Sequence, residues 1–268
     1  MSTGPWLITP EGASAVRAAF ASPALALDDY EDVEAEDEHE RDYDLVDGVA
    51  RIRVVGPLFA TLSFWAWLCG GKSYPQIAAA VQAADADPEV SSIVLDLDSP
   101  GGEVNGVQGA AFAVASARKP LTAFVTGSCC SAAYWIASGA KRIVASPTAI
   151  VGSIGVYGRL ADERSDAKDW DDTRVRTVIA SQSPRKLPDF DAEGGMADVQ
   201  TQIDDLCAVF VETVAAGRGI TTDQVLERYG QGAAFVAARA LGAGLIDEVA
   251  DAADTWLSIG RQQPSESN

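Results

Sequence analysis

The residues best suited to covalent chemistry lie in the stretch TGSCCSAAYWIASG, residues 126–139, which contains Cys129, Cys130 and Ser131. This stretch ends an apolar run and begins a run of small residues, so a buried strand is expected to pass into a helix here. A nucleophile at such a helix start gains from the helix dipole and from free N–H groups. The alternative for Ser131 is the ordinary role of a helix N-cap.

The general base decides which mechanism is open to a serine. The only histidine, His39, lies in the acidic stretch EDEHE, so a Ser-His-Asp triad is not expected. Lysine can replace histidine where burial favours its neutral form. Most of the five lysines fall in a loop, at helix ends or among acids (Lys72, Lys119, Lys141, Lys168). The remaining candidate is Lys186, just beyond a predicted strand, for which a surface position is the alternative.

A second strand end with chemical potential is DSPGG, residues 98–102. Two consecutive glycines allow backbone conformations that are closed to other residues and can present N–H groups to a ligand. The loops at the carboxyl ends of strands in an open α/β sheet converge on one crevice. An ordinary tight turn is the alternative for this motif.

The elements that must position these residues alternate along the chain. β-branched apolar runs predict strands at 48–56, 91–98, 121–127, 142–146, 149–158, 175–181 and 245–249. Helices are predicted at 10–20, 74–88, 103–119, 131–140, 221–230 and 235–244, with a long amphipathic helix from Met196 and a last helix near the end. This alternation predicts an α/β fold with a largely parallel sheet.

Composition and charge limit the function classes. The formal charge is −19, and eleven acidic residues fall within residues 28–44, which is typical of a disordered linker; an acidic pro-segment or docking tail is the alternative. We therefore predict an N-terminal helical segment at 1–27, a linker at 28–45, a main domain at 46–258 and a polar tail at 259–268. No basic cluster indicates nucleic-acid binding.

The same composition argues against a membrane protein, a metal protein and a disulfide framework. The N-terminus has no secretory signal pattern, and the longest apolar stretch is interrupted by Pro57 and by glycines. The four cysteines have no metal-binding spacing and fit reduced thiols. We expect a cytoplasmic protein with no metal, no other cofactor and no membrane contact.

Four motifs, in this order, resemble one family: DSPGG, GSCCSAAYWIA, PTAIVGSIGVYG and AARALGAGLIDEV. Together they resemble the signal peptide peptidase A family of serine peptidases, the S49 type, and within it the capsid maturation (prohead) proteases of tailed phages and prophages. The resemblance covers roughly residues 46–249. It implies a ClpP/crotonase-like fold and a Ser-Lys dyad.

Carried over motif by motif, the resemblance implies a role for each site residue. Ser131 stands at the nucleophile position, and Lys186 falls where the family places its general base. Gly102 matches the glycine whose N–H binds the oxyanion, with the N–H of Ala132 as its partner. Ser153 matches the serine that orients the lysine amine.

Two departures from the family pattern affect this reading. The sequence SQSPRK lacks a glycine that the family usually has before its lysine, so Arg185 competes with Lys186 in the alignment, although arginine cannot act as a base. The N-terminal anchor of membrane-bound relatives is also not expected here, which favours the phage-type role. Cys129 and Cys130 are then expected to fill space at the strand-to-helix bend.

The expected function is that of a serine endopeptidase that processes scaffold, portal or capsid precursor during phage capsid maturation. We expect a homo-oligomer that acts in the host cytoplasm, within the procapsid, and cuts beside small residues, as the family resemblance implies. Four alternatives stay open. They are a cytoplasmic protease of general peptide turnover, a crotonase-type acyl-CoA enzyme, a ClpP-type protease that needs His39, and a catalytically silent assembly component.

Overall fold

The computed structural model describes residues 6–8 (backbone), 42–61, 70–158, 182, 194, 196–251 and 255–262. Most of its strands form an eight-stranded sheet in the order β11-β10-β8-β6-β3-β2, with β9 beside β8 and β12 beside β9. Its strands are β2 (Asp44–Val46), β3 (Val49–Val55), β6 (Ser92–Ser99), β8 (Leu121–Cys130), β9 (Arg142–Ala145), β10 (Ile150–Gly152), β11 (Ala234–Val236) and β12 (Glu248–Val249). The pairs β3-β6, β6-β8, β8-β9, β8-β10 and β9-β12 are parallel.

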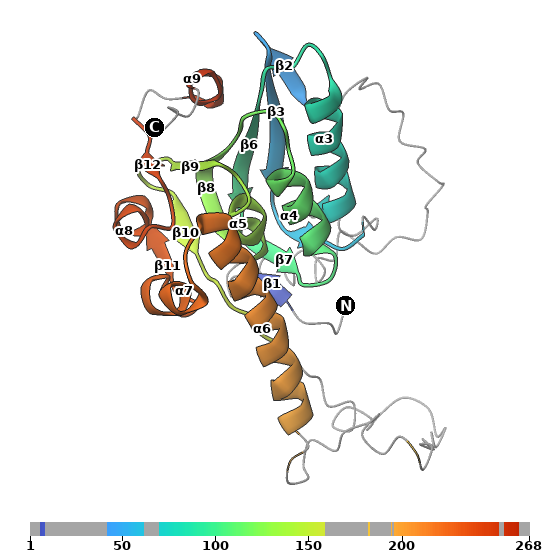
Figure 1. Cartoon of the computed structure of the whole chain (residues 1–268), viewed down its shortest axis with the longest axis vertical. Coiled ribbons are helices and arrows are strands. Elements are labelled where there is room, and N and C mark those ends of the chain that lie inside the picture. Colours follow the sequence, from blue (N-terminus) through green and yellow to red (C-terminus); the bar gives the residue numbers. More distant parts are fainter. Residues whose placement is uncertain are drawn as a thin grey trace, which may run out of the picture.

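A second, four-stranded sheet has the order β1-β7-β4-β5. Its strands are β1 (Trp6–Ile8), β4 (Leu58–Phe59), β5 (Lys72–Ser73) and β7 (Gly101–Glu103). β7 is parallel to β4 and antiparallel to β1. The small sheet lies beneath the carboxyl ends of β3 and β6 (Figure 1). The chain therefore passes from one sheet to the other at the glycines after β6.

The large sheet is covered by helices on both faces. Alternate residues of β6 point to opposite sides, so Ile93, Leu95 and Leu97 face the main core, whereas Val94 faces a smaller one. The main core lies under α3 (Tyr74–Ala86), α4 (Val107–Ala115), α5 (Ala132–Ala137) and α6 (Ala197–Arg218). The smaller core lies under α9 (Trp256–Arg261), which contacts β3, β6 and β8. This double burial explains why these strands are nearly continuous apolar runs.

Local sequence signals set the helix boundaries. Ser73 and Gln76 form a capping box at the start of α3, and Thr221 and Gln224 form another at α7 (Thr222–Arg228). α8 (Ala237–Ala243) ends at Gly244, which adopts a left-handed conformation. α6 extends away from the body at its amino-terminal end (Figure 1). In the described part of the chain no helix is long and apolar enough to cross a membrane.

The predicted fold class is confirmed: the structure is an α/β fold with a mostly parallel sheet between helices. Several predicted elements are shorter than expected. The predicted helix 103–119 begins only at Val107, because Gly101–Glu103 forms β7. The sheet also starts slightly earlier than Val46, with β2. The predicted helix 10–20 and strand 175–181 lie outside the described residues.

Candidate active site

Ser131 follows the central strand β8, and Ser153 follows the neighbouring strand β10. The two strands run parallel, and the last pair in their register is Cys130 opposite Gly152. The Ser131 backbone N–H donates to the Gly152 carbonyl oxygen at 2.8 Å, which extends this pairing. Because the strands are parallel, both serines lie at the carboxyl ends of the strands, next to each other along the sheet.

The glycine turn approaches the same point from the other side of β8. β6 and β8 are parallel, and their last pair is Ser99 opposite Cys129. Beyond this pair the chain enters β7, which contains Gly102, and β7 contacts α5, which starts directly after Ser131. Ser131 therefore lies between the glycine turn and Ser153, although the three segments are far apart in the sequence.

The backbone of Ser131 is strained. Its φ is 57° and its ψ is −120°, a region that residues with a Cβ rarely occupy, and the residue is only 1% exposed. Ser131 occupies the N-cap position of α5, but its side chain makes no capping hydrogen bond, so helix capping does not account for the serine here. A sharp strand-to-helix turn with a strained serine at its apex is the arrangement of a nucleophile elbow.

Ser153 also has a left-handed backbone, with φ 56°. Its N–H donates to the Ala233 carbonyl oxygen at 2.8 Å. The preceding Gly152 has φ 126°, and a Cβ there would lie 2.8 Å from the same oxygen. The loop that contains Ala233 thus fixes the backbone turn at Ser153.

Gly102 is required by close packing between backbones. A Cβ at Gly102 would lie 1.8 Å from the Leu58 carbonyl oxygen, because β4 runs directly against β7. Gly101, with φ 102°, donates its N–H to Ser99 Oγ at 3.2 Å, and Ser99 Oγ donates to the Gly56 carbonyl oxygen at 2.7 Å. Ser99 thereby ties the glycine turn to the end of β3.

A bulge in β8 adjusts the position of Ser131. The register between β6 and β8 shifts between Leu97 and Ser99. At the bulge, Asp98 Oδ1 accepts the Ser128 N–H at 2.8 Å. A Cβ on Gly127 would lie 2.2 Å from that same carboxylate oxygen, so the bulge needs glycine there. Sequence reasoning missed the roles of Asp98 and Ser99, although both belong to the DSPGG motif.

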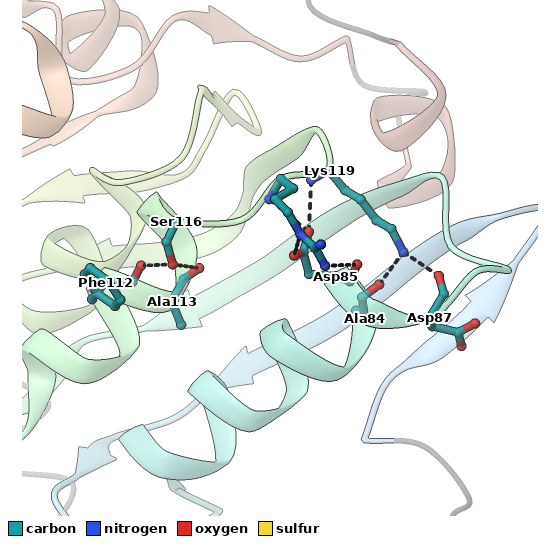
Figure 2. Close-up of polar contacts among 8 residues, drawn as sticks. Ala84, Asp85, Asp87, Phe112, Ala113, Ser116 and Lys119 are labelled. Carbon is teal, nitrogen blue, oxygen red and sulfur yellow. Dashed lines mark hydrogen bonds and ion pairs between the residues drawn. The ribbon is translucent and has the colours of Figure 1, made fainter.

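Two of the lysines lie at the amino-terminal ends of strands, whereas Ser131 lies at the carboxyl end of β8. Lys119 Nζ donates to the carbonyl oxygens of Ala84, at 2.8 Å, and Asp87 (Figure 2). Lys119 precedes β8, whose ten residues separate it from Ser131 by roughly 30 Å. Lys141 precedes β9, which starts beside the beginning of β8. Neither lysine is placed to act as the base.

Lys72 lies on β5, in the sheet that also contains Gly102. Burial lowers the pKa of its ammonium, opposed by Asp42 and Asp44 and reinforced by Arg53. Lys72 is therefore the natural competitor to test against the predicted base. Lys168 and Lys186 lie outside the described residues, so the structure does not describe the position of the predicted base.

Cys129 and Cys130 are the last two residues of β8, and both are buried. Burial, reinforced by the neighbouring Cys130, raises the pKa of the Cys129 thiol well above its usual range. A protonated thiol is a poor nucleophile, which argues against Cys129. Cys130 Sγ donates to the Ile150 carbonyl oxygen at 3.6 Å, so Ser131 remains the candidate for covalent chemistry in the opening stretch.

A pocket of about 480 Å³ opens beside Ser153; its lining is mostly apolar but includes Gln200, Asp204 and Gln231. Its walls come from the segment after β10, from α6 and α7 and from the loop near Gly232, and include Ile154, Val156, Ile203, Val211 and Val225.

Among the described residues, no group of three or more His, Cys, Asp or Glu side chains is arranged to hold a metal.

Comparison with known proteins identifies the family. The model of peptidase family S49 matches residues 113–262, which include β8, Ser131 and Ser153. The chain belongs to peptidase family S49. This confirms the resemblance inferred from the motifs, and members of the family share the ClpP-like fold.

Several known proteins resemble the chain along most of its length. The head-tail preconnector protein GP5 of Enterobacteria phage P21 is 32% identical over 223 residues, 80% of this chain and 43% of that protein. The capsid assembly protease C of Escherichia phage lambda is 32% identical over 245 residues, 88% of this chain and 53% of that protein. Protease 4 of Salmonella typhi is 31% identical over 182 residues, 65% of this chain and 28% of that protein. The chain spans about half the length of the two phage proteins.

Proposed function

We propose that the chain is a serine endopeptidase in which Ser131 is the nucleophile and Lys186 is the general base. The observation that carries the proposal is the strained turn at Ser131, placed between the glycine turn and Ser153. Strain of this kind persists where the surrounding fold imposes it, and it clusters at active sites. Because the chain belongs to a peptidase family, we interpret this geometry as a site for peptide-bond hydrolysis.

The proposed oxyanion hole consists of the N–H groups of Gly102 and Ala132. Ala132 is the first residue of α5, so its N–H has no acceptor within the helix. Gly102 is held against β4 by a packing contact that leaves no room for a side chain. Donors fixed before reaction stabilise developing charge without a reorganisation cost.

In the proposed mechanism neutral Lys186 accepts the proton of Ser131 Oγ while Oγ bonds to the carbonyl carbon of the substrate. The oxyanion is held by the two N–H groups. The C–N bond then breaks, and Lys186 gives the proton to the leaving amine. Water next attacks the acyl-enzyme while Lys186 accepts a proton from it, and Lys186 returns this proton to Ser131 Oγ as the ester bond breaks. The role proposed for Ser153 is to orient the lysine amine.

We propose head proteins of a tailed phage as substrates: scaffold, portal or capsid precursor. The support is the likeness to a capsid assembly protease and to a head-tail preconnector protein. The place of action is then the procapsid in the host cytoplasm, and the peptidase domain is residues 46–258. A homo-oligomer is part of this proposal, since the amino-terminal half of α6 extends beyond the body (Figure 1). General peptide turnover is the second candidate, favoured by the likeness to protease 4.

The test combines a fluorophosphonate probe with a candidate scaffold protein as substrate. Wild type is expected to be labelled at Ser131 and to cleave. Ser131→Ala and Lys186→Ala are expected to lose cleavage by at least about 10³-fold. Lys141→Ala is the matched control and is expected to behave as wild type, because Lys141 lies at the other edge of the sheet.

Each alternative predicts a different pattern. If Lys72→Ala lost cleavage and Lys186→Ala did not, the general base would be Lys72 and not Lys186. A wild-type protein that neither labels nor cleaves would refute the peptidase and leave the acyl-CoA enzyme or the silent assembly component. Cleavage of unfolded casein but not of head proteins would favour general turnover.

A further inference from the structure

The edge of the strand that contains Gly102 is covered by another part of the same chain. β1 pairs antiparallel with β7 (Figure 1). In the register, Leu7 lies opposite Gly102, Trp6 opposite Glu103 and Ile8 opposite Gly101. The other edge of β7 is occupied by β4. The N-terminal strand therefore takes the one edge of β7 that other described strands leave open.

That edge suits an extended polypeptide. Peptides bind to exposed sheet edges by adding a strand, and the main-chain hydrogen bonds provide affinity for many sequences. Gly101 and Gly102 leave the edge without side chains, so another backbone can approach closely. A substrate whose scissile carbonyl accepts the Gly102 N–H must also lie against β7. A single edge cannot pair with β1 and with such a substrate at once.

We propose that the segment Trp6–Ile8 occupies the peptide-binding edge of β7 in the resting protein and is displaced by substrate. This inference rests on the proposed function of Gly102. The strand has only three residues, so it forms a short ladder that a longer peptide displaces. If the segment covers the edge nine-tenths of the time, the apparent KM for substrate is raised about tenfold.

A reversible cross-link tests the position and its consequence together. Opposed residues of an antiparallel pair have Cα atoms about 4.5–5.5 Å apart, within the span of a disulfide. The double variant Trp6→Cys/Glu103→Cys is therefore expected to form a disulfide on oxidation. The oxidised form should keep the circular dichroism spectrum of the reduced form, and fluorophosphonate labelling of Ser131 should fall, because the oxygen of the probe and β1 compete for the Gly102 N–H. Its cleavage of a protein substrate should fall at least tenfold and return on reduction.

The outcomes separate the inference from the proposed function. Failure of the disulfide to form, or equal cleavage by oxidised and reduced protein, overturns the inference and leaves the peptidase intact. A reduced and wild-type protein that neither labels nor cleaves refutes the proposed function, and the inference falls with it. Glu103→Cys alone is the control, since the Glu103 carboxylate accepts the Ala60 N–H at 2.9 Å and its loss has its own effect.

Proline substitutions provide a second measurement without cross-linking. Alternate residues of an antiparallel strand direct their N–H groups to the partner, so one of Leu7→Pro and Ile8→Pro removes a ladder bond. That variant is expected to have a KM several-fold below wild type with an unchanged kcat. Leu7→Ala and Ile8→Ala keep the N–H and serve as controls. A wild-type KM in both proline variants overturns the inference.

Discussion

Replacing Ser131 by glycine is expected to give a more stable protein than replacing it by alanine. The backbone at Ser131, φ 57° and ψ −120°, costs a residue with a Cβ about 1–3 kcal/mol, whereas glycine adopts it freely. Glycine also makes the unfolded chain more flexible, which offsets about 0.4–1 kcal/mol of this gain. The net advantage of Ser131→Gly over Ser131→Ala should be about 1 kcal/mol in the free energy of unfolding.

Ser138 provides the matched control at the other end of α5. It is also buried, but its φ of −62° and ψ of −21° are ordinary helical values. Its Oγ donates to the Trp135 carbonyl oxygen at 2.7 Å, and both substitutions remove this bond. Only the flexibility of the unfolded chain then distinguishes them, so Ser138→Gly should be less stable than Ser138→Ala.

Urea unfolding of the four variants measures both differences. A gain of 1 kcal/mol corresponds to roughly 2–4 °C in Tm for a chain of this size, so thermal unfolding provides a second reading. None of the Ser131 variants needs to be active, and the result is independent of the substrate. If glycine and alanine at Ser131 were equally stable while the Ser138 pair behaved as expected, Ser131 would not be strained and the nucleophile-elbow argument would fail.

Three further predictions concern other parts of the structure. Gly102→Ala should lower Tm, and it should lower kcat by about 10²–10³-fold. Gly109→Ala is the control: a Cβ at this position of α4 meets nothing within 4 Å, so kcat should stay unchanged and Tm should rise slightly. A wild-type kcat with a lowered Tm in Gly102→Ala would support the packing role of Gly102 and refute its oxyanion role. Arg51→Met should lower the free energy of unfolding, measured in urea, by about 3 kcal/mol, because Asp96 is only 4% exposed and loses its ionic partner. A loss of less than about 0.5 kcal/mol would contradict this prediction. Burial raises the pKa of the Cys129 thiol, so iodoacetamide at pH 9 should alkylate Cys129 only after the protein is unfolded. Mass spectrometry of the peptide that contains Cys129 measures this, and alkylation in the native protein would contradict the burial of the thiol.

The sequence predicts the large sheet well because its signal is local. Runs such as SIVLDLDS are buried on both faces between α3–α5 and α9, and uniform burial requires a continuous apolar pattern. The amphipathic spacing from Met196 likewise anticipates α6. The small sheet was not predicted, because β4, β5 and β7 are two or three residues long and are held by distant partners.

The site was predictable in its residue types more than in its geometry. A serine at a strand end, a glycine pair and a second serine are visible as motifs, and the structure brings all three to one edge. The positive φ of Ser131 could not be predicted from the sequence, because serine, unlike glycine, does not favour a left-handed backbone. The fourth element of the prediction, Lys186, lies outside the described residues and stays a prediction.

The bulge in β8 explains why the motifs must be spaced as they are. From the pair Leu97–Val125 to the pair Ser99–Cys129, β6 advances by two residues (99 − 97) and β8 by four (129 − 125). Without the bulge, Ser131 would fall in register with residue 103 instead of residue 101. The bulge therefore draws the serine back to the glycine pair. Asp98, by binding the Ser128 N–H, makes the motif that contains Gly102 also the motif that sets the position of Ser131.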